Sequence, residues 1–125
     1  MRLLLDTQIY LWFLADSRRL STAARREIDR AETVAVSAAS IWEAAVKIGI
    51  GKLTASVDDL LGNIALSGFV ELPVQGRHAA RVASLPDLHR DPFDRLLVAQ
   101  AMEEPLRLLT ADGFLAGYSD LVAVV

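Results

Sequence analysis

The sequence predicts an α/β domain in which a mostly parallel central sheet is flanked by helices. Short apolar segments alternate with helical segments along the chain, which is typical of parallel strands connected by helices. The first of these segments, RLLL, shows no alternation of polar and apolar residues, as expected for a strand covered on both faces. With 125 residues, of which 53% are hydrophobic, the chain can form one core. We therefore expect a single domain, residues 1–125, built as a three-layer sandwich.

The composition limits the chemistry of this domain. The chain has no cysteine and only two histidines, so oxygen atoms must be the main ligands of any metal ion, which favours Mg²⁺ or Mn²⁺. The formal net charge of −3 means that a nucleic-acid partner would require metal ions and a local cluster of Arg and Lys. No apolar run approaches the ~20 residues of a membrane span, and the strand-like N-terminus leaves no room for a signal peptide. We expect a cytoplasmic protein with no membrane partner.

The first strand and helix carry a carboxylate and three aromatic side chains. Residues 2–5 form the expected central strand, and Asp6 follows at its carboxyl end, where open α/β sheets bind ligands. The short helix expected over residues 9–14 contains Tyr10, Trp12 and Phe13. Part of this helix must face the core. The rest either packs against a neighbouring helix or forms a surface for a partner.

Capping serines and a β-branched run predict the next three elements. These are a helix over residues 22–31, a strand over 33–37 and a helix over 38–48. Glu43 lies near the start of the last of these helices, four residues before Lys47. An ordinary ion pair between the two explains this Glu as well as a site in which Lys47 orients Glu43 or holds a phosphate.

The middle of the chain is expected to add a helix, a strand and another helix. Their bounds are 57–66, 69–72 and 77–84. The last of them carries three basic side chains, Arg77, His78 and Arg81. These side chains form either a patch that faces phosphate groups or an ordinary solvated helix face.

The segment HRDPFDRLLVAQA, residues 89–101, begins a helix with two carboxylates in its first turn. Asp91 reads as the N-cap, Pro92 as the first helical position and Asp94 as the third. The rest of the helix is apolar nearly all round, which indicates burial between the sheet and other helices. Capping and the helix dipole explain Asp91 better than Asp94, which must point along the start of the helix toward the sheet.

The C-terminal residues are expected to complete the sheet. A strand over residues 106–110 is followed by Asp112, and a last strand over 121–125 lies at the edge of the sheet. Gly113 makes a tight turn an equally good explanation for Asp112.

Four carboxylates are expected to converge at one edge of the sheet. They are Asp6, Glu43, Asp94 and Asp112. Two of them follow strands and two lie in the first turns of helices, and right-handed crossovers bring the carboxyl ends of parallel strands to one edge. Like charges at short range raise one another's pKa, so a divalent cation is the natural occupant. Mg²⁺ or Mn²⁺ at this edge could activate water for an in-line phosphoryl displacement.

Four segments resemble the PIN-domain ribonucleases, and more closely the VapC-type toxins of bacterial toxin–antitoxin pairs. The segments are LLLDTQIYLW, SAASIWEAAVKIGIGKL, HRDPFDRLLVAQA and RLLTADGF, in the order of the family between residues 3 and 114. The resemblance implies a PIN-like sandwich in which Asp6, Glu43, Asp94 and Asp112 bind Mg²⁺ or Mn²⁺ and position the hydrolytic water. Asp91 matches a further acid that caps the helix or supports the site. Thr7 and Thr110 lie beside these acids and are candidates for orienting them or the water.

The same resemblance implies an activity and two partners. The activity is endonucleolytic cleavage of RNA that leaves a 5′-phosphate and a 3′-hydroxyl. The partners are a cognate antitoxin, whose C-terminal segment wraps the toxin, and usually a second copy in a homodimer. We expect an apolar helix of the antitoxin near Tyr10, Trp12 and Phe13, with a basic residue that reaches the acids. The RNA target stays open, because family members cleave transfer, ribosomal or messenger RNA.

Two other classes of function are an aspartyl-phosphate protein, either a phosphatase or a receiver domain, and a binding module without catalysis. A haloacid-dehalogenase-type phosphatase needs a second Asp two positions after the first, where Gln8 stands. A receiver domain needs paired acids before its first helix, and residues 1–6 contain no pair. A PIN-fold binding module without catalysis stays open, although the presence of all four acids argues against it.

Overall fold

The computed structural model describes all 125 residues and contains one five-stranded sheet in the order β3-β2-β1-β4-β5. Its strands are β1 (Arg2–Leu5), β2 (Thr33–Ser37), β3 (Val70–Leu72), β4 (Arg107–Thr110) and β5 (Val122–Val124). Every neighbouring pair is parallel, which confirms the predicted fold class, and β5 lies at the predicted edge. Strand order reverses between β1 and β4. This is the switch point at which ligands bind in open α/β sheets.

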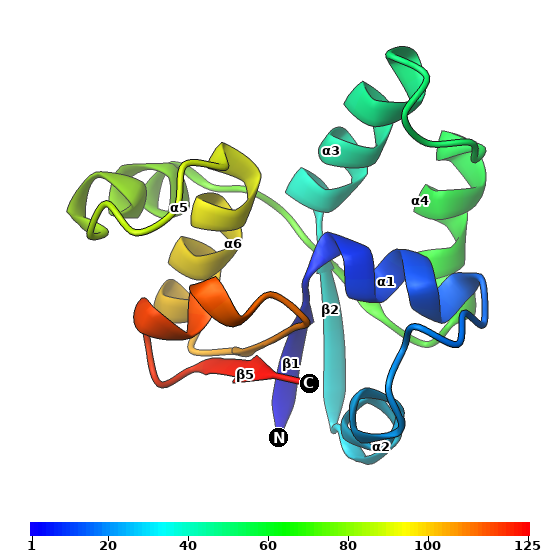
Figure 1. Cartoon of the computed structure of the whole chain (residues 1–125), viewed down its shortest axis with the longest axis horizontal. Coiled ribbons are helices and arrows are strands. Elements are labelled where there is room, and N and C mark those ends of the chain that lie inside the picture. The colour runs from blue at the N-terminus through cyan, green and yellow to red at the C-terminus, as the bar shows by residue number, and fades with distance from the viewer.

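Helices cover both faces of this sheet (Figure 1). They are α1 (Thr7–Leu14), α2 (Thr22–Arg30), α3 (Ala38–Gly49), α4 (Val57–Leu66), α5 (Gly76–Arg81) and α6 (Pro92–Glu103), with 3₁₀ turns η1 (Val82–Ser84) and η2 (Gly113–Gly117). The helix expected over 77–84 is thus divided into α5 and η1, and η2 stands where a turn was expected. No helix has the length and apolar character that crossing a membrane requires.

Alternate residues of β1 face two separate apolar clusters. Leu3 and Leu5 pack in a cluster with buried side chains of α1, α2 and α4, whereas Leu4 faces a cluster that contains the buried side chains of α6. Leu97 and Val98 of α6 are completely buried, as the all-round apolar pattern predicts. Because both faces of the sheet are covered, only the ends of the strands are left open for polar chemistry.

Of the three basic residues of α5, His78 contradicts both expectations, whereas Arg77 and Arg81 lie on a partly exposed face and are engaged in ion pairs. His78 is completely buried, and its Nε2 lies 2.6 Å from Oε2 of Glu104 at the end of α6. Arg77 and Arg81 form ion pairs with Glu103, and Arg77 also pairs with Glu104. The hydrogen bond from His78, helped by Arg77, lowers the pKa of Glu104. These side chains hold α5 against α6.

Candidate active site

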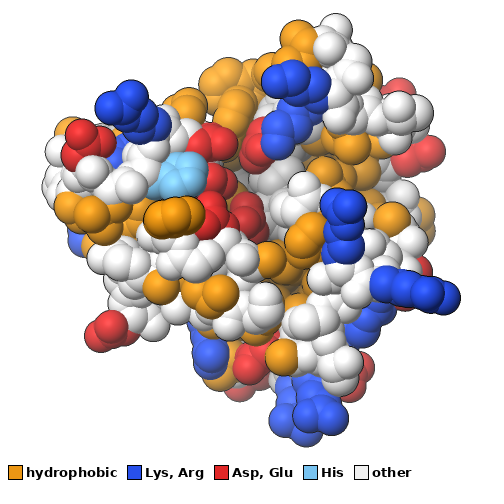
Figure 2. Space-filling model, viewed as in Figure 1, with side chains coloured by type: hydrophobic (Ala, Val, Ile, Leu, Met, Phe, Trp, Pro, Cys, Tyr) orange, Lys and Arg blue, Asp and Glu red, His pale blue; other side chains and the backbone are white.

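The carboxyl ends of β1 and β4 open into an acidic pocket of about 320 Å³. Its lining includes all four predicted carboxylates together with Asp91: Asp6, Glu43, Asp91, Asp94 and Asp112. Figure 2 shows these acidic side chains gathered in a hollow of the surface, with basic side chains on one rim. Side chains from distant parts of the sequence therefore meet in one place, as the predicted topology requires.

Asp6 is held at the floor of the pocket by the neighbouring strand. The register of β1 and β4 pairs Leu5 with Leu109, which places Thr110 beside Asp6. The Thr110 hydroxyl donates a hydrogen bond of 2.7 Å to Oδ2 of Asp6 and accepts one of 3.0 Å from the backbone N–H of Asp112. Burial raises the pKa of Asp6, and Glu43 and Asp112 add to the increase, whereas the Thr110 hydrogen bond opposes it. Thr110 thus has the geometry predicted for a residue that orients the acids.

Thr7 has a different arrangement from the one expected. Its hydroxyl donates a hydrogen bond of 2.8 Å to the Ser40 hydroxyl, in the buried contact between α1 and α3. Only the backbone of Thr7 acts on an acid, because its hydrogen bond lowers the pKa of Asp6. The side chain of Thr7 therefore positions α1 against α3 and does not itself orient a carboxylate.

Glu43 is a buried carboxylate of which only one oxygen is paired. Oε2 lies 2.7 Å from Nζ of Lys47, so the expected ion pair exists, and this contact raises the pKa of Lys47. Oε1 is buried and has no hydrogen-bond partner. An unpaired buried carboxylate oxygen is costly, because desolvation is not compensated. The ion pair therefore explains the position of Oε2. Oε1 is left available as a ligand of a cation or as an acceptor of a hydrogen bond in the pocket.

Asp91 and Asp94 have separate tasks at the start of α6. Oδ1 of Asp91 accepts hydrogen bonds from the backbone N–H groups of Phe93 at 2.9 Å and Asp94 at 3.4 Å, which confirms Asp91 as the N-cap. The Asp94 side chain is 15% exposed. Burial raises the pKa of Asp94 to about 7, and the charges of Asp6, Asp91, Glu43 and Asp112 contribute. Near neutral pH this pocket therefore resists full ionisation unless positive charge enters it.

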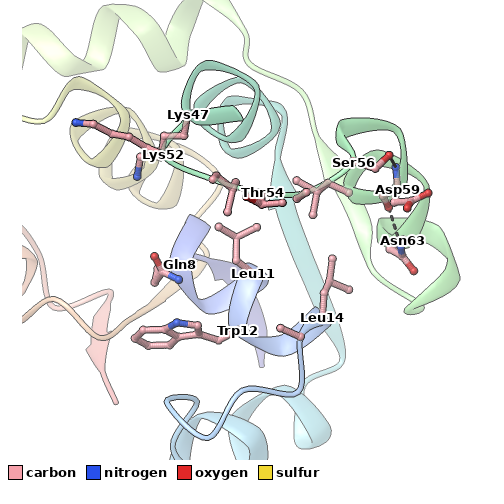
Figure 3. A pocket seen from close by; sticks show the side chains of 14 residues that line it. Gln8, Leu11, Trp12, Leu14, Lys47, Lys52, Thr54, Ser56, Asp59 and Asn63 are labelled. Carbon is pink, nitrogen blue, oxygen red and sulfur yellow. Dashed lines mark hydrogen bonds between the residues drawn. The ribbon is translucent and has the colours of Figure 1, made fainter. Parts of the chain in front are cut away.

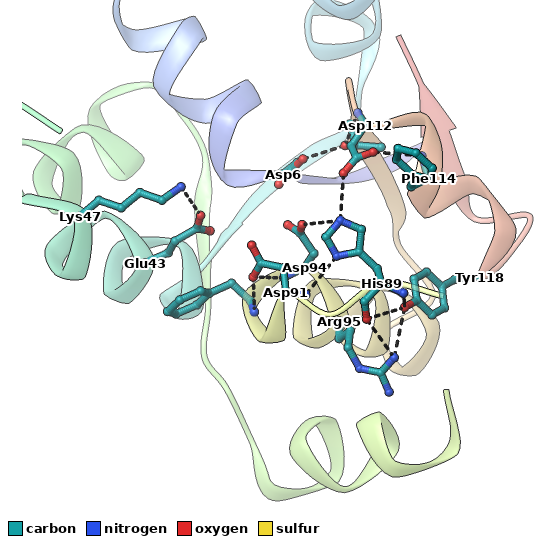
Figure 4. Close-up of polar contacts among 12 residues, drawn as sticks. Asp6, Glu43, Lys47, His89, Asp91, Asp94, Arg95, Asp112, Phe114 and Tyr118 are labelled. Carbon is teal, nitrogen blue, oxygen red and sulfur yellow. Dashed lines mark hydrogen bonds and ion pairs between the residues drawn. The ribbon is translucent and has the colours of Figure 1, made fainter. Parts of the chain in front are cut away.

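Asp112 caps η2 and also faces the pocket. Its Oδ1 accepts a hydrogen bond of 3.0 Å from the backbone N–H of Phe114, so the turn explanation holds for this oxygen. Its Oδ2 lies 3.4 Å from Nε2 of His89, which is 3.7 Å from Oδ2 of Asp94 (Figure 4). The sequence interpretation missed His89. Its position two residues before the helix-capping Asp91 was the available signal.

The pocket suits a hard divalent cation. Its potential ligands are carboxylate oxygens, the type that Mg²⁺ and Mn²⁺ prefer, and one of them, Oε1 of Glu43, is buried without a partner. The raised pKa of Asp6 and Asp94 shows that a cation would relieve repulsion and desolvation in this pocket. One ligand atom each from His89, Asp94 and Asp112 lie within 4.8 Å of one another. Asp94 and Asp112 are therefore close enough to contact one ion, and Asp6 and Glu43 line the same pocket.

The three aromatic residues of α1 do not form one surface. Tyr10 is buried in the core, where its hydroxyl donates a hydrogen bond of 2.6 Å to the carbonyl of Leu60, so the expectation that it belongs to a partner surface was wrong. Burial raises its pKa to about 12. Phe13 packs against Phe69, with ring centroids 5.0 Å apart. Phe13 and Trp12 are both half-buried, but Phe13 lines a hollow beside α2, whereas Trp12 lines a separate groove.

This groove has a volume of about 670 Å³ and runs beside the acidic pocket (Figure 3). Its apolar wall is formed by α1 and α4 and by the segment between α3 and α4, and it includes Leu11, Trp12, Leu53 and Leu60. Gln8 and Lys47 line both the groove and the acidic pocket. The two hollows therefore adjoin each other at Gln8 and Lys47.

The fold and the pocket define a parallel α/β domain with clustered carboxylates at the switch point of its sheet. A family model described as "PIN domain" matches residues 3–119. The chain belongs to the PIN domain family, as the four sequence segments predicted.

Relatives of the chain agree with this assignment. The chain is 33% identical over 111 residues to "Ribonuclease VapC22" of Mycobacterium tuberculosis, and the match covers 87% of this chain and 85% of that protein. A "Toxin-antitoxin complex from Klebsiella pneumoniae" contains a similar fold, with a TM-score of 0.68, 20% identity and coverage of 98% and 96% of the two chains. VapBC2 from Rickettsia felis, solved with a DNA fragment from the promoter, has a TM-score of 0.70, 16% identity and coverage of 100% and 98%.

Proposed function

We propose that this protein is a metal-dependent endoribonuclease that acts as the toxin of a toxin–antitoxin pair. The observation that carries the proposal is the pocket in which Asp6, Glu43, Asp94 and Asp112 meet at the switch point of the sheet. The name of the relative, a ribonuclease, supports the substrate class. The two structural neighbours, both toxin–antitoxin complexes, support the biological role.

The four carboxylates would hold the cation and orient the attacking water. A divalent cation supplies positive charge that makes water more acidic and offsets the charge of the phosphodiester during in-line displacement. The bond from the water oxygen to phosphorus forms as the bond from phosphorus to the 3′-oxygen breaks, which leaves a 5′-phosphate and a 3′-hydroxyl. Glu43 is suited to orient the water, because its unpaired Oε1 is an acceptor. Thr110 keeps Asp6 in place through its hydrogen bond.

A local group of basic side chains beside the pocket is suited to contact the RNA backbone. Lys47, Lys52 and Arg90 line a shallow hollow that also contains Glu43 and Asp91. Positive charge at this rim would attract the phosphates on either side of the scissile bond. This group supplies the basic cluster that the net charge of −3 makes necessary.

The antitoxin would occupy the groove beside Trp12. An apolar helix fits the wall formed by Leu11, Trp12, Leu53 and Leu60, because amphipathic helices dock in grooves of this kind. Since the groove adjoins the acidic pocket, a long basic side chain of the same segment would be able to reach the carboxylates. We also propose that the toxin is a homodimer. A second copy would cover the exposed side chain of Trp42 on α3, which lies outside the hollow assigned to the RNA.

The activity is tested with Asp94→Asn, which keeps the shape of the side chain and removes an anionic ligand. We expect it to abolish Mn²⁺-dependent cleavage of a generic RNA while the protein remains folded. Asp58→Asn is the matched control, because Asp58 lies exposed on α4 outside the pocket. Cleavage is followed on gels with Mn²⁺ or with EDTA, and the new ends are mapped. Wild-type rates in Asp94→Asn, or equal cleavage in EDTA, would contradict the proposal. The second result would favour chemistry without a metal ion.

A further inference from the structure

A histidine lies beside the carboxylates of the pocket, between Asp94 and Asp112. His89 belongs to the segment between η1 and α6, and Figure 4 shows its ring directed at both carboxyl groups. Its Nε2 is 3.4 Å from Oδ2 of Asp112 and 3.7 Å from Oδ2 of Asp94. Both distances are longer than the roughly 2.7 to 3.2 Å of an N–H···O bond. A small rotation of either carboxyl group would complete a hydrogen bond to this nitrogen.

The other ring nitrogen determines where the hydrogen of His89 lies. The backbone N–H of Asp91 donates a hydrogen bond of 3.1 Å to Nδ1, so Nδ1 is an acceptor without a hydrogen. The ring hydrogen is therefore on Nε2, the atom that faces the carboxylates. A histidine that binds a metal ion through Nε2 carries its hydrogen on Nδ1. A hydrogen on Nδ1 of His89 would clash with the hydrogen of the Asp91 backbone N–H, which points at the same nitrogen. His89 is arranged as a donor rather than as a ligand.

The segment that carries His89 is held by two further side chains. The Tyr118 hydroxyl accepts a hydrogen bond of 2.7 Å from the backbone N–H of His89. Nη1 of Arg95 donates to this hydroxyl at 3.1 Å and to the carbonyl of Pro86 at 2.9 Å. Arg95 lies at the start of α6, yet it contacts backbone carbonyls rather than the acidic pocket. Its guanidinium thus fixes the position of the imidazole.

We propose that His89 is a positioning residue of the metal centre. It donates its Nε2–H to Asp112 and Asp94, and so holds both carboxylates in the orientation in which they bind the cation, without binding the cation itself. A neutral donor reduces the repulsion between the two carboxylates, whereas a Lys or Arg in this position would compete with the cation for them. The inference rests on the function proposed for the pocket.

The test compares His89→Ala and His89→Gln with Asp87→Asn in the full-length, metal-free protein. Asp87 is exposed in the same segment and serves as the matched control. Calorimetry without RNA measures the binding of Mn²⁺ and of Mg²⁺. We expect His89→Ala to weaken the binding of both ions by about tenfold, the usual effect of removing a residue that orients a ligand. His89→Gln should recover most of the affinity, because its amide N–H can replace the imidazole N–H. Asp87→Asn should bind as wild type does.

A second measurement reads the tautomer directly. Long-range ¹H–¹⁵N spectra of the metal-free protein should show the hydrogen of His89 on Nε2 and none on Nδ1, which accepts the hydrogen bond from Asp91. A hydrogen on Nδ1 would overturn the inference.

Two results of the calorimetry would also overturn it. The first is an affinity of His89→Ala for Mn²⁺ that equals the affinity of wild type. The other is a loss in both variants that is much larger for Mn²⁺ than for Mg²⁺, because a nitrogen ligand favours Mn²⁺ and its removal would show direct coordination. A wild-type protein that binds neither ion would instead overturn the function proposed for the pocket.

Discussion

Asp94 is the carboxylate whose ionisation is opposed most clearly in the metal-free protein. Burial is the first cause of its pKa of about 7, and the charges of the surrounding acids are the second. A structural capping role would not require this environment, because Asp91 already caps α6. The position of Asp94 therefore stabilises a bound cation at the expense of the metal-free fold.

This environment predicts the pH dependence of stability. Because the folded pKa of Asp94 is above its ordinary value of 3.8, the contribution of this group to stability is complete below about pH 4 and is lost as the pH rises through about 7. Asp94→Asn cannot ionise and avoids this loss. In metal-free protein at pH 8 we expect it to be more stable than wild type by up to about 4 kcal/mol, since the pKa is raised from 3.8 to about 7 and each pKa unit corresponds to about 1.4 kcal/mol.

The measurement is urea unfolding in EDTA at about pH 5 and pH 8, with Asp58→Asn as the control. The difference between Asp94→Asn and wild type should shrink at the lower pH. A variant that is less stable than wild type at pH 8 would show that Asp94 is an ordinary surface or capping residue.

Among the elements, the start of α6 carries two carboxylates with different expected roles. Asp91 caps the helix, and Asp94 is a proposed ligand of the cation. Asp91 bonds to two backbone N–H groups, so Asp91→Ala should lower the free energy of unfolding by about 1 kcal/mol, and Asp91→Ser should lower it little. If capping is its main role, the Mn²⁺ affinity of Asp91→Ser should fall much less than that of Asp94→Asn. Chemical unfolding and calorimetry measure the two quantities. Equal losses of affinity in both variants would place Asp91 among the ligands.

Helix α1 lies between the acidic pocket and the groove, so it can affect both metal binding and partner binding. It begins directly after Asp6, and Trp12 lines the groove. We expect Trp12→Ala to weaken binding of the cognate antitoxin by about 2 kcal/mol, the usual effect of truncating a buried aromatic anchor. Leu66→Ala is the control, because Leu66 is 83% exposed on α4 and lies outside the groove. Calorimetry with purified antitoxin decides the matter: equal affinities of the Trp12 variant and wild type would remove the groove from the interface.

At the scale of the whole molecule, the pocket joins elements that are distant in the sequence. Its carboxylates come from the ends of β1 and β4, from the first turn of α6 and from the second turn of α3, where Glu43 lies one turn further into the helix than the sequence predicted. Binding of a cation at this junction therefore connects both halves of the sheet with both helical layers. The stability of the complete fold should respond to the cation.

Melting curves of wild type and Asp6→Asn, each with and without Mn²⁺, test this response. Mn²⁺ at about 100 times its dissociation constant should stabilise wild type by ~2.7 kcal/mol. Asp6→Asn should respond much less, because a ligand at the floor of the pocket is lost. Its metal-free form should be at least as stable as wild type, since removing one buried charge reduces repulsion. Equal shifts in the two proteins would exclude Asp6 from the cation site.

Local patterns in the sequence were sufficient to predict the fold class, the order of the strands and the approach of Asp6, Glu43, Asp94 and Asp112. Hydrophobic periodicity and capping are local properties, and parallel connections then bring the strand ends to one edge. The Asp91 cap was predicted for the same reason.

The burial and the hydrogen-bond partners of individual side chains could not be predicted from the sequence and are known only from the folded protein. The tertiary structure buried Tyr10 and His78, left one oxygen of Glu43 unpaired and placed His89 between two acids. It also placed the groove that Trp12 lines next to the acidic pocket. Hydrophobic periodicity predicts which face of a helix is buried, but it does not predict which residues of other elements pack against that face. The burial and hydrogen bonding of a side chain depend on neighbours from other elements, whose positions are determined only when the layers pack together.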